Sequence, residues 1–253
     1  MSDDNLKDIP KARLAGIPNG PQLLPTPDQR IKDYWAVCDQ ILIDRSLPDT
    51  KNKTGIETSV LAGVDTFDRE LRDGESLLVK AKNNKTYLIY RTPTTVNQTN
   101  ANAVRAEVDM TNTSTVAALH LDPANVREIS TGLLNAIPEV KKLAAPAIST
   151  GTTNVPLGLP SGSVFAVNNA AGTKDFYVVQ SDGFDQVKST TADLIRYKNS
   201  PNGGNIPVIG PDKMSSLQAQ HRIDDSTFPA AVPEVLRAQS TDASVACLEW
   251  NLQ

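Results

Sequence analysis

The sequence has little positive charge and no long apolar run. The 253 residues include 25 Lys and Arg against 29 Asp and Glu, a formal net charge of −4, whereas proteins that bind nucleic acid or anionic membranes carry a basic surface. No window approaches the roughly 20 apolar residues of a membrane span. The acidic start, Met1-Ser2-Asp3-Asp4, also lacks the parts of a secretory leader. We therefore expect no nucleic-acid partner, and these features alone predict a cytosolic protein.

Aromatic residues are scarce, whereas prolines are frequent. Five Phe, five Tyr and two Trp stand against 17 Pro, which favours short elements and many turns over one long helical bundle. Hydrophobic residues make up 39% of the chain, which is enough to build a core. The length allows one large domain or two to three small ones.

The motifs of common catalytic sites are missing. The only histidines, His120 and His221, lie far apart without a neighbouring cysteine, which argues against a zinc site; we interpret both as surface or partly buried structural residues. Residues 158–162 do not form a Gly-x-Ser-x-Gly nucleophile motif. The Gly-rich pieces at 151–153 and 202–204 lack the lysine of a phosphate-binding loop. The sequence therefore predicts no catalytic residue, no metal site and no cofactor.

A cluster of carboxylates between residues 65 and 75 has two interpretations. Phe67 and Leu71 are four positions apart, so they would face one side of a helix. The surrounding acids form either a divalent-cation or acid–base site, or, as we favour, the solvated face of that amphipathic helix. These acids are Asp65, Asp68, Glu70, Asp73 and Glu75.

Two regions of the chain share one order of elements. Residues 164–167 and 176–179 are short apolar runs separated by a polar turn, which predicts a hairpin, and residues 191–197 resemble the start of a helix. Upstream, residues 77–79 and 87–90 repeat the hairpin pattern. The expected correspondence has a constant offset, since Val96 and Val187 are 91 positions apart. At the same offset Ala101, Val104 and Arg105 match Ala192, Ile195 and Arg196.

A third element, a short helix ended by proline, is predicted after each hairpin and once near the start. It covers 134–138 and 6–10, with a weaker form at 214–221. Other predicted strands are 35–43 and 58–63. The predicted fold is α+β, with small hairpin and helix repeats packed around a mostly β core. The predicted parts are 1–33 (the end of a truncated repeat and a Pro-rich connector), 34–75 (first part of the core), 76–150 and 160–233 (repeat units), and 234–253 (return to the core).

The only two cysteines, Cys38 and Cys247, lie near opposite ends of the body, each within three residues of a Trp. They are either two buried free thiols or one disulfide. An even cysteine pair, together with a first repeat that lacks its front half, suggests an extracytoplasmic fragment of a longer, membrane-anchored chain. We predict that the two cysteines are bonded, on apolar strand ends where a Trp covers the sulfurs, and that this bond closes the core.

A set of motifs spanning nearly the whole chain resembles the EccB component of the ESX, or type VII, secretion system of mycobacteria and related actinobacteria. The hairpin at 176–179 matches best, whereas 92–100 and 111–115 depart from the family pattern. The matching motifs are residues 6–10 followed by 16–21, Trp35-x-Val37-Cys38-Asp39, residues 132–139 with 146–148, residues 176–179 followed by Asp182-Gly183 and Val187, and residues 191–196.

The resemblance implies a short cytoplasmic N-terminus, one transmembrane helix and a large extracytoplasmic part, of which this chain looks like the last. It implies a structural subunit of the secretion complex that associates with itself and with other ESX membrane components, touching the membrane only through a transmembrane helix outside this sequence. Two alternatives stay open. One is a nucleotide hydrolase, since family members have been described as ATPases. The other is a cell-wall binding module with exposed Tyr on its hairpins.

Overall fold

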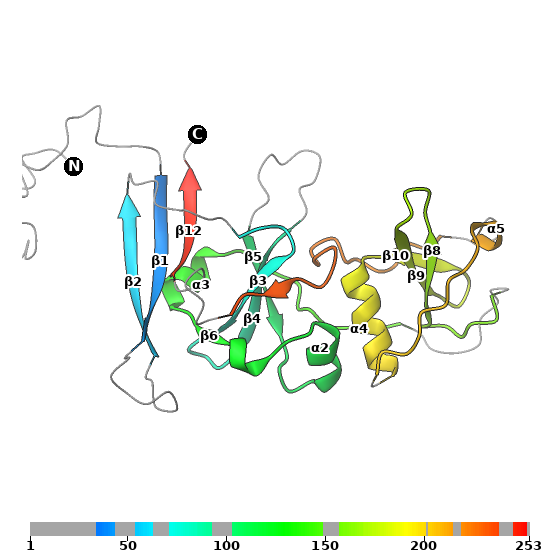
Figure 1. Cartoon of the computed structure of the whole chain (residues 1–253), viewed down its shortest axis with the longest axis horizontal. Coiled ribbons are helices and arrows are strands. Elements are labelled where there is room, and N and C mark those ends of the chain that lie inside the picture. The colour runs from blue at the N-terminus through cyan, green and yellow to red at the C-terminus, as the bar shows by residue number, and fades with distance from the viewer. Residues whose placement is uncertain are drawn as a thin grey trace, which may run out of the picture.

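The computed structural model describes residues 34–43, 54–62, 71–92, 103–148, 157–200, 202–214, 219–237 and 245–251. These residues form three sheets that follow one another along the longest axis of the molecule (Figure 1). Strands from the two ends of the sequence meet in the sheet at one end of this row. The predicted elements at 1–33 lie outside the described residues.

The first sheet joins the start and the end of the described chain. It consists of β1 (Tyr34–Ile43), β2 (Thr54–Ala62) and β12 (Val245–Asn251) in the order β12-β1-β2, with both pairs antiparallel. Alternating apolar residues in β1, such as Val37 and Ile41, favour this extended form. The strands predicted at 35–43 and 58–63 are confirmed, the second one beginning four residues earlier than expected. We call this sheet the stapled sheet, because it carries the disulfide described below.

The central sheet is built around the predicted upstream hairpin. β3 (Glu75–Lys80) and β4 (Thr86–Arg91) pair antiparallel, and β5 (Ala103–Val108) follows β4. The turn between β3 and β4 has Asn84 at a φ of 65°, a conformation that asparagine tolerates better than most residues. Short strands complete both edges of the sheet: β6 (Arg127–Glu128), β7 (Glu139–Val140) and β11 (Glu234–Val235).

The distal sheet contains the second hairpin. β8 (Val164–Asn168) pairs with β9 (Lys174–Val179), and β10 (Phe184–Val187) lies on the other side of β9. In the turn, the Asn169 carboxamide oxygen accepts hydrogen bonds from the backbone N–H groups of Ala171 and Thr173, so this side chain takes the place of a backbone acceptor. Both predicted hairpins are therefore confirmed.

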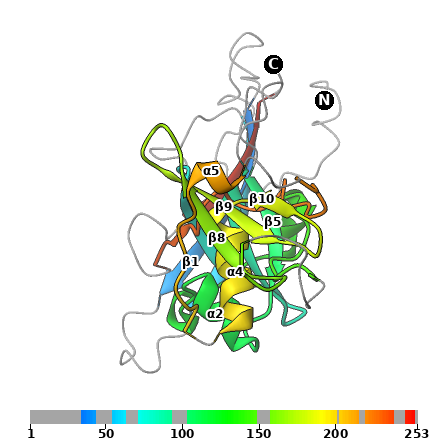
Figure 2. The same ribbon diagram turned by 90° about the vertical axis from the view of Figure 1, so that its right-hand side faces the viewer.

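The helices lie between the sheets. α3 (Thr131–Ala136) lies beside the stapled sheet, while α2 (Thr113–Ala118) and α4 (Ser189–Asn199) pack against each other between the central and distal sheets (Figures 1 and 2). The remaining helical turns are η4 (Pro123–Asn125) and α5 (Pro211–Met214). The predicted helix at 191–197 falls within α4, and the short helix before Pro138 is α3.

The central sheet is buried on both faces. One face carries Leu78, Leu88 and Tyr90, which pack with α2 and with Leu194 of α4. The other carries Val79 and Ile89, which pack with α3 and with three partly buried residues of the stapled sheet, Val37, Ala246 and Leu248. This double burial explains why β4 reads as a continuous apolar run rather than an alternating one.

Helix α4 is shared between two cores. Its Ala192 and Ile195 side chains pack on Val164 and Val178 of the distal sheet, whereas Leu194 belongs to the core of the central sheet. Because successive helical residues point about 100° apart, one helix can serve both sides. The central and distal sheets are thus held together by an apolar contact and not only by the connecting chain.

The constant offset of 91 residues is wrong at Val104 and Arg105, whereas Val96 and Ala101 lie outside the described residues. Val104 and Arg105 lie in strand β5, whereas their expected counterparts Ile195 and Arg196 lie in helix α4. Residues 103–108 alternate strictly between partly buried and buried, the period of a strand. What the two regions do share is the order hairpin, third strand, helix: β3-β4-β5-α2 and β8-β9-β10-α4.

The amphipathic helix expected between 65 and 75 does not extend over its described part. Residues 71–74 form a turn with Gly74 at a φ of 86°, and Glu75 begins β3. The Glu75 carboxylate accepts a hydrogen bond from the backbone N–H of Arg72. The rest of that segment lies outside the described residues. Of the weaker element at 214–221, Met214 ends α5 and 215–218 are likewise not described.

Candidate functional site

The described residues contain no catalytic constellation. Both histidines are exposed and lie at positive φ, 50° for His120 and 53° for His221, so they occupy turns. Within the described ranges no three His, Cys, Asp or Glu side chains gather as metal ligands. No helix among those described is long and apolar enough to span a membrane.

The tyrosines of the upstream hairpin are not available to a glycan. Tyr87 and Tyr90 are both buried, and burial raises the pKa of Tyr90. In the distal hairpin, Tyr177 is partly buried and stacks on the buried Phe165 ring at a centroid distance of 5.3 Å. The exposed hairpin tyrosines expected for a cell-wall binding module are therefore wrong for the upstream unit.

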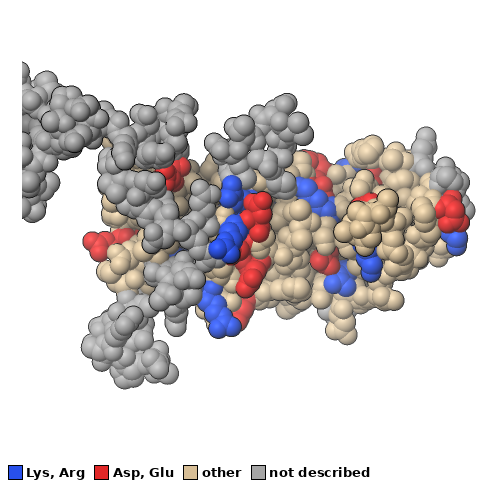
Figure 3. Space-filling view, turned by 45° about the horizontal axis from the view of Figure 1, so that its top comes forward, with Lys and Arg blue, Asp and Glu red and all other residues tan. Residues whose placement is uncertain are grey.

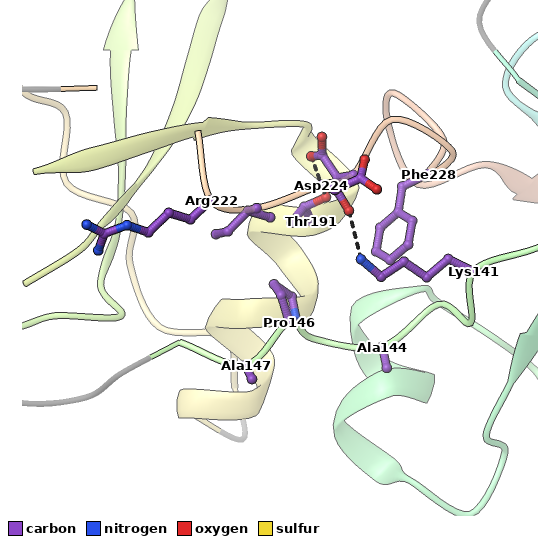
Figure 4. Close-up of a pocket in the computed structure, with 10 residues that line it drawn as sticks. Lys141, Ala144, Pro146, Ala147, Thr191, Arg222, Asp224 and Phe228 are labelled. Carbon is purple, nitrogen blue, oxygen red and sulfur yellow. Dashed lines mark hydrogen bonds between the residues drawn. The ribbon is translucent and has the colours of Figure 1, made fainter. Parts of the chain in front are cut away.

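A small pocket of about 230 Å³ opens between the central and distal sheets (Figure 4). This volume is below the range of roughly 300–1,000 Å³ typical of small-molecule sites. The lining residues that Figure 4 labels are Lys141, Ala144, Pro146, Ala147, Thr191, Arg222, Asp224 and Phe228. Its polar residues Arg222, Asp224 and Asp225 come from the segment 219–235, which we call the strap, whereas Lys141 and Thr191 come from other parts of the chain.

The polar groups of the pocket are engaged in holding the fold together. Asp225 accepts hydrogen bonds from the Lys188 backbone N–H and from the Thr191 hydroxyl, both at 2.7 Å. Lys188 is the N-cap residue of α4 and makes no side-chain cap of its own, so the strap caps this helix with a favourable negative charge. Lys141 donates to the Asp224 carbonyl at 3.1 Å. A hydrogen bond from the Ser226 hydroxyl to the Asp224 carboxylate holds the pKa of Asp224 below its usual value.

The strap ties the distal sheet to the central one. At one end, the buried Asp185 of β10 accepts hydrogen bonds from the backbone N–H groups of Arg222 and Ile223, both at 3.0 Å. In its middle, Thr227 accepts a hydrogen bond from the Tyr90 hydroxyl at 2.8 Å. At the other end, β11 pairs with β3. The strap and its contacts therefore form a structural joint between the distal and central sheets.

The stapled sheet contains the predicted disulfide. Cys38 and Cys247 are bonded, and they lie directly opposite each other in the β1–β12 pair with Cα atoms 4.0 Å apart. Two parts of the prediction are wrong. The cysteines lie inside the strands rather than at strand ends. Trp35 cannot cover the sulfurs, because residues three apart in a strand point to opposite faces.

A buried acid, Asp39, lies next to the disulfide in strand β1. Asp39 is 1% exposed and points to the side of α3. Its carboxylate accepts a hydrogen bond from the Thr58 hydroxyl at 2.8 Å and one from the Ser130 backbone N–H at 2.7 Å. Burial lowers the pKa of the nearby Arg127, while the charge of Asp39 opposes that effect. One signal of this cluster is visible in the sequence, because Asp39 stands at an inward position of an apolar strand.

Several charged side chains on the surface form ion pairs with opposite charges. Glu107 lies between Lys85 and Lys142, at 2.6 and 3.0 Å, and these lysines hold the pKa of Glu107 below its usual value. Arg105 contacts Glu139 at 2.9 Å. On the face drawn in Figure 3, blue and red side chains stand next to each other across the middle of the described surface. This pattern agrees with the low net charge and offers no extended basic field there.

The sequence model of one protein family, described as Type VII secretion system ESX-1, transport TM domain B, matches residues 1–253. The chain belongs to this EccB family. Among its curated relatives, the ESX-2 secretion system ATPase EccB2 of Mycobacterium tuberculosis is 32% identical over 247 residues, covering 96% of this chain and 46% of that protein. The ESX-3 secretion system ATPase EccB3 of the same organism is 26% identical, covering 99% and 46%.

Two solved structures from ESX complexes have a similar fold. The EccB3 dimer from the ESX-3 core complex superposes with a TM-score of 0.62 at 24% identity, covering 87% of this chain and 56% of that one. The periplasmic assembly from the ESX-5 inner membrane complex gives a TM-score of 0.63 at 20% identity, covering 86% and 49%. The chain spans about half the length of the curated relatives that it matches.

Proposed function

We propose that this chain is a structural part of the inner-membrane complex of an ESX secretion system, where it assembles with a second copy of itself and with other ESX subunits. The family match over residues 1–253 carries the proposal. The geometry supports it, because buried polar contacts link the sheets: Asp39 of the stapled sheet binds the start of α3, and the strap joins the distal sheet to the central one.

An extracytoplasmic location belongs to this proposal. A disulfide that joins residues 209 positions apart is stable in an oxidising compartment and rare in the reducing cytosol. The cytosolic location predicted from the acidic start is set aside for this reason. We propose that attachment to the membrane occurs through a single transmembrane helix in a longer protein, as the description of the family model suggests.

We also propose that residues 76–150 and 160–233 are related repeat units held on a core made by 34–75 and 234–253. The shared order of hairpin, third strand and helix supports this division, as does the return of β12 to β1. If the two units are related, α2 and α4 are equivalent helices in them, and these two helices pack against each other.

The assembly proposal is tested by purification from membranes. We expect an affinity-tagged full-length protein that contains this chain to co-purify, after extraction in a mild detergent, with the other membrane components of its ESX system. The matched control is the same tagged protein without residues 34–251, which should lose most of that co-purification. Equal recovery of the complex by both proteins would contradict a role of this chain in assembly.

The isolated chain is expected to hydrolyse no ATP above background in the presence of Mg²⁺, although the names of its relatives include ATPase. Phosphate release is the measurement, on protein purified twice by independent steps. A matched pair of variants is available: Lys141→Ala removes the pocket lysine, and Lys142→Ala removes its surface neighbour. Hydrolysis that survives repurification and is lost only in Lys141→Ala would establish the enzymatic alternative instead.

A further inference from the structure

The middle of the strap is held less firmly than its ends. At one end Ile223 donates its backbone N–H to the buried Asp185 of β10, and at the other end Glu234 begins β11, which pairs with β3. Between these anchors, residues 224–230 form no helix or strand, and most of them are exposed or partly exposed. Segments with little regular structure and few buried contacts open most readily in native proteins.

A single turn in this middle part carries two anchors. The Phe228 backbone N–H donates to the Asp225 carbonyl at 2.9 Å, so both residues belong to one turn, residues 225–228. The Asp225 carboxylate binds the backbone N–H of Lys188 at the start of α4. The Phe228 side chain is 3% exposed and belongs to the core of the central sheet, together with Leu194. The turn therefore joins a charge on the helix to a ring in the core.

The start of α4 depends on this part of the strap for its hydrogen-bond partners. Lys188 makes no side-chain cap, and its ammonium group donates to the carbonyls of Ser226 and Phe228 at 2.7 and 2.6 Å. The next backbone N–H along the helix, that of Ser189, donates to the Ala230 carbonyl at 3.1 Å. Because the first N–H groups of a helix have no partner inside it, loss of these contacts would leave them to water.

The turn has space beside it. The pocket of about 230 Å³ is lined by Thr191, Asp225 and Phe228, among others (Figure 4), so the turn is not closely packed on that side. Atoms that border such a space lack attractive contacts across it. The Tyr90 hydroxyl also holds the turn, through a hydrogen bond of 2.8 Å to the Thr227 carbonyl.

We infer that residues 225–228 are a latch between the central and distal sheets, which opens as one unit while both ends of the strap stay bound. In the open state Asp225 leaves the start of α4 and Phe228 leaves the core of the central sheet in the same step. The first turn of α4 then frays. The contact between α2 and α4 remains to hold the two sheets together, so the row of sheets can bend at this place.

Hydrogen exchange of the native chain, resolved by residue, tests the latch without any substitution. The backbone N–H groups of Lys188, Ser189 and Phe228 should exchange through one common opening, roughly 100-fold faster than those of β4. This opening should respond little to low concentrations of denaturant, because it exposes little surface. The N–H groups of Ile223 and Glu234 should stay protected. Exchange of all these groups in step with β4 would mean that they open only by global unfolding, which would overturn the latch.

Two neighbouring acids give a matched pair of variants with the same change of charge. Asp225→Asn weakens the bond to α4, and it should raise exchange at Lys188 and Phe228 by about tenfold. Asp224→Asn is the control, because the Asp224 carboxylate binds Ser226 within the strap, and it should change exchange at those two residues less than twofold. The same result for both variants, or faster exchange throughout β8 and β9 in Asp225→Asn, would contradict a local latch.

A third variant tests whether the two anchors move together. Phe228→Leu leaves every backbone hydrogen bond of the turn in place and shortens only the side chain in the central core. If the turn opens as one unit, exchange at Lys188 and Ser189 should still rise severalfold. A rise confined to the central sheet would show that Asp225 and Phe228 open separately, and the latch would be wrong. None of these outcomes depends on assembly with ESX subunits, so the proposed function is decided independently.

Discussion

Replacing both cysteines in a Cys38→Ser, Cys247→Ser variant is expected to lower the free energy of unfolding by about 2–5 kcal/mol. The bond joins residues 209 positions apart, so its loss restores much of the conformational freedom of the unfolded chain. The fold depends on this closure, because β1 and β12 come from opposite ends of the described chain and together bury Val37, Ala246 and Leu248 against the central sheet. A loss of this size is a large share of the stability of a typical domain.

Thermal unfolding with and without reductant measures the effect. The midpoint of the native chain should fall when reductant is added, whereas that of the double variant should be low and insensitive to reductant. Ser59→Ala serves as the control, because Ser59 of β2 lies directly opposite Cys38 of β1 but forms no part of the disulfide. An unchanged midpoint in the double variant, or two titratable thiols in the oxidised native chain, would show that the bond does not stabilise the fold.

The elements that the sequence predicted correctly are those with a clear local period. The alternation in residues 35–43, the two paired apolar runs around polar turns, and the apolar pair before Pro138 each specify one conformation with little help from the rest of the chain. The even number of cysteines allowed either two free thiols or one disulfide, and the predicted disulfide is present. The family followed from the order of several weak motifs, none of which is specific alone.

The errors arose where tertiary packing decides between two local options. Residues 103–108 contain apolar positions that fit either a helix or a strand, and pairing with β4 selects the strand. Gly74 and the start of β3 end any helix before residue 75. The joint between the central and distal sheets could not be predicted. It depends on Asp225, which binds the backbone N–H of Lys188 at the start of α4 and lies 37 positions away from it in the sequence. Such contacts leave no periodic signal in the sequence.

Replacing Asp39 by alanine is expected to destabilise the fold by about 2–5 kcal/mol, because it leaves hydrogen-bond donors at a buried site without their acceptor. Asp39 is 1% exposed and Arg127 is 4% exposed, and the variant removes the negative charge that opposes the effect of burial on the pKa of Arg127. The variant also removes the acceptor of two hydrogen bonds, from the Thr58 hydroxyl and from the Ser130 backbone N–H. Because Ser130 caps α3, the damage should reach the contact between α3 and the stapled sheet.

Three further variants separate the charge from the hydrogen bonds. Thr58→Val removes one hydrogen bond and should cost about 1 kcal/mol. Asp39→Asn keeps an acceptor oxygen without the charge and should fall between Thr58→Val and Asp39→Ala. Arg127→Met is made alone and together with Asp39→Ala. The unfolding free energies of these variants, measured by chemical denaturation, form a double-mutant cycle. If the charges stabilise each other, Asp39→Ala costs less in the Arg127→Met background than in the native one. Equal costs in both backgrounds would mean that Asp39 acts only through Thr58 and Ser130, as a link between β2 and the start of α3.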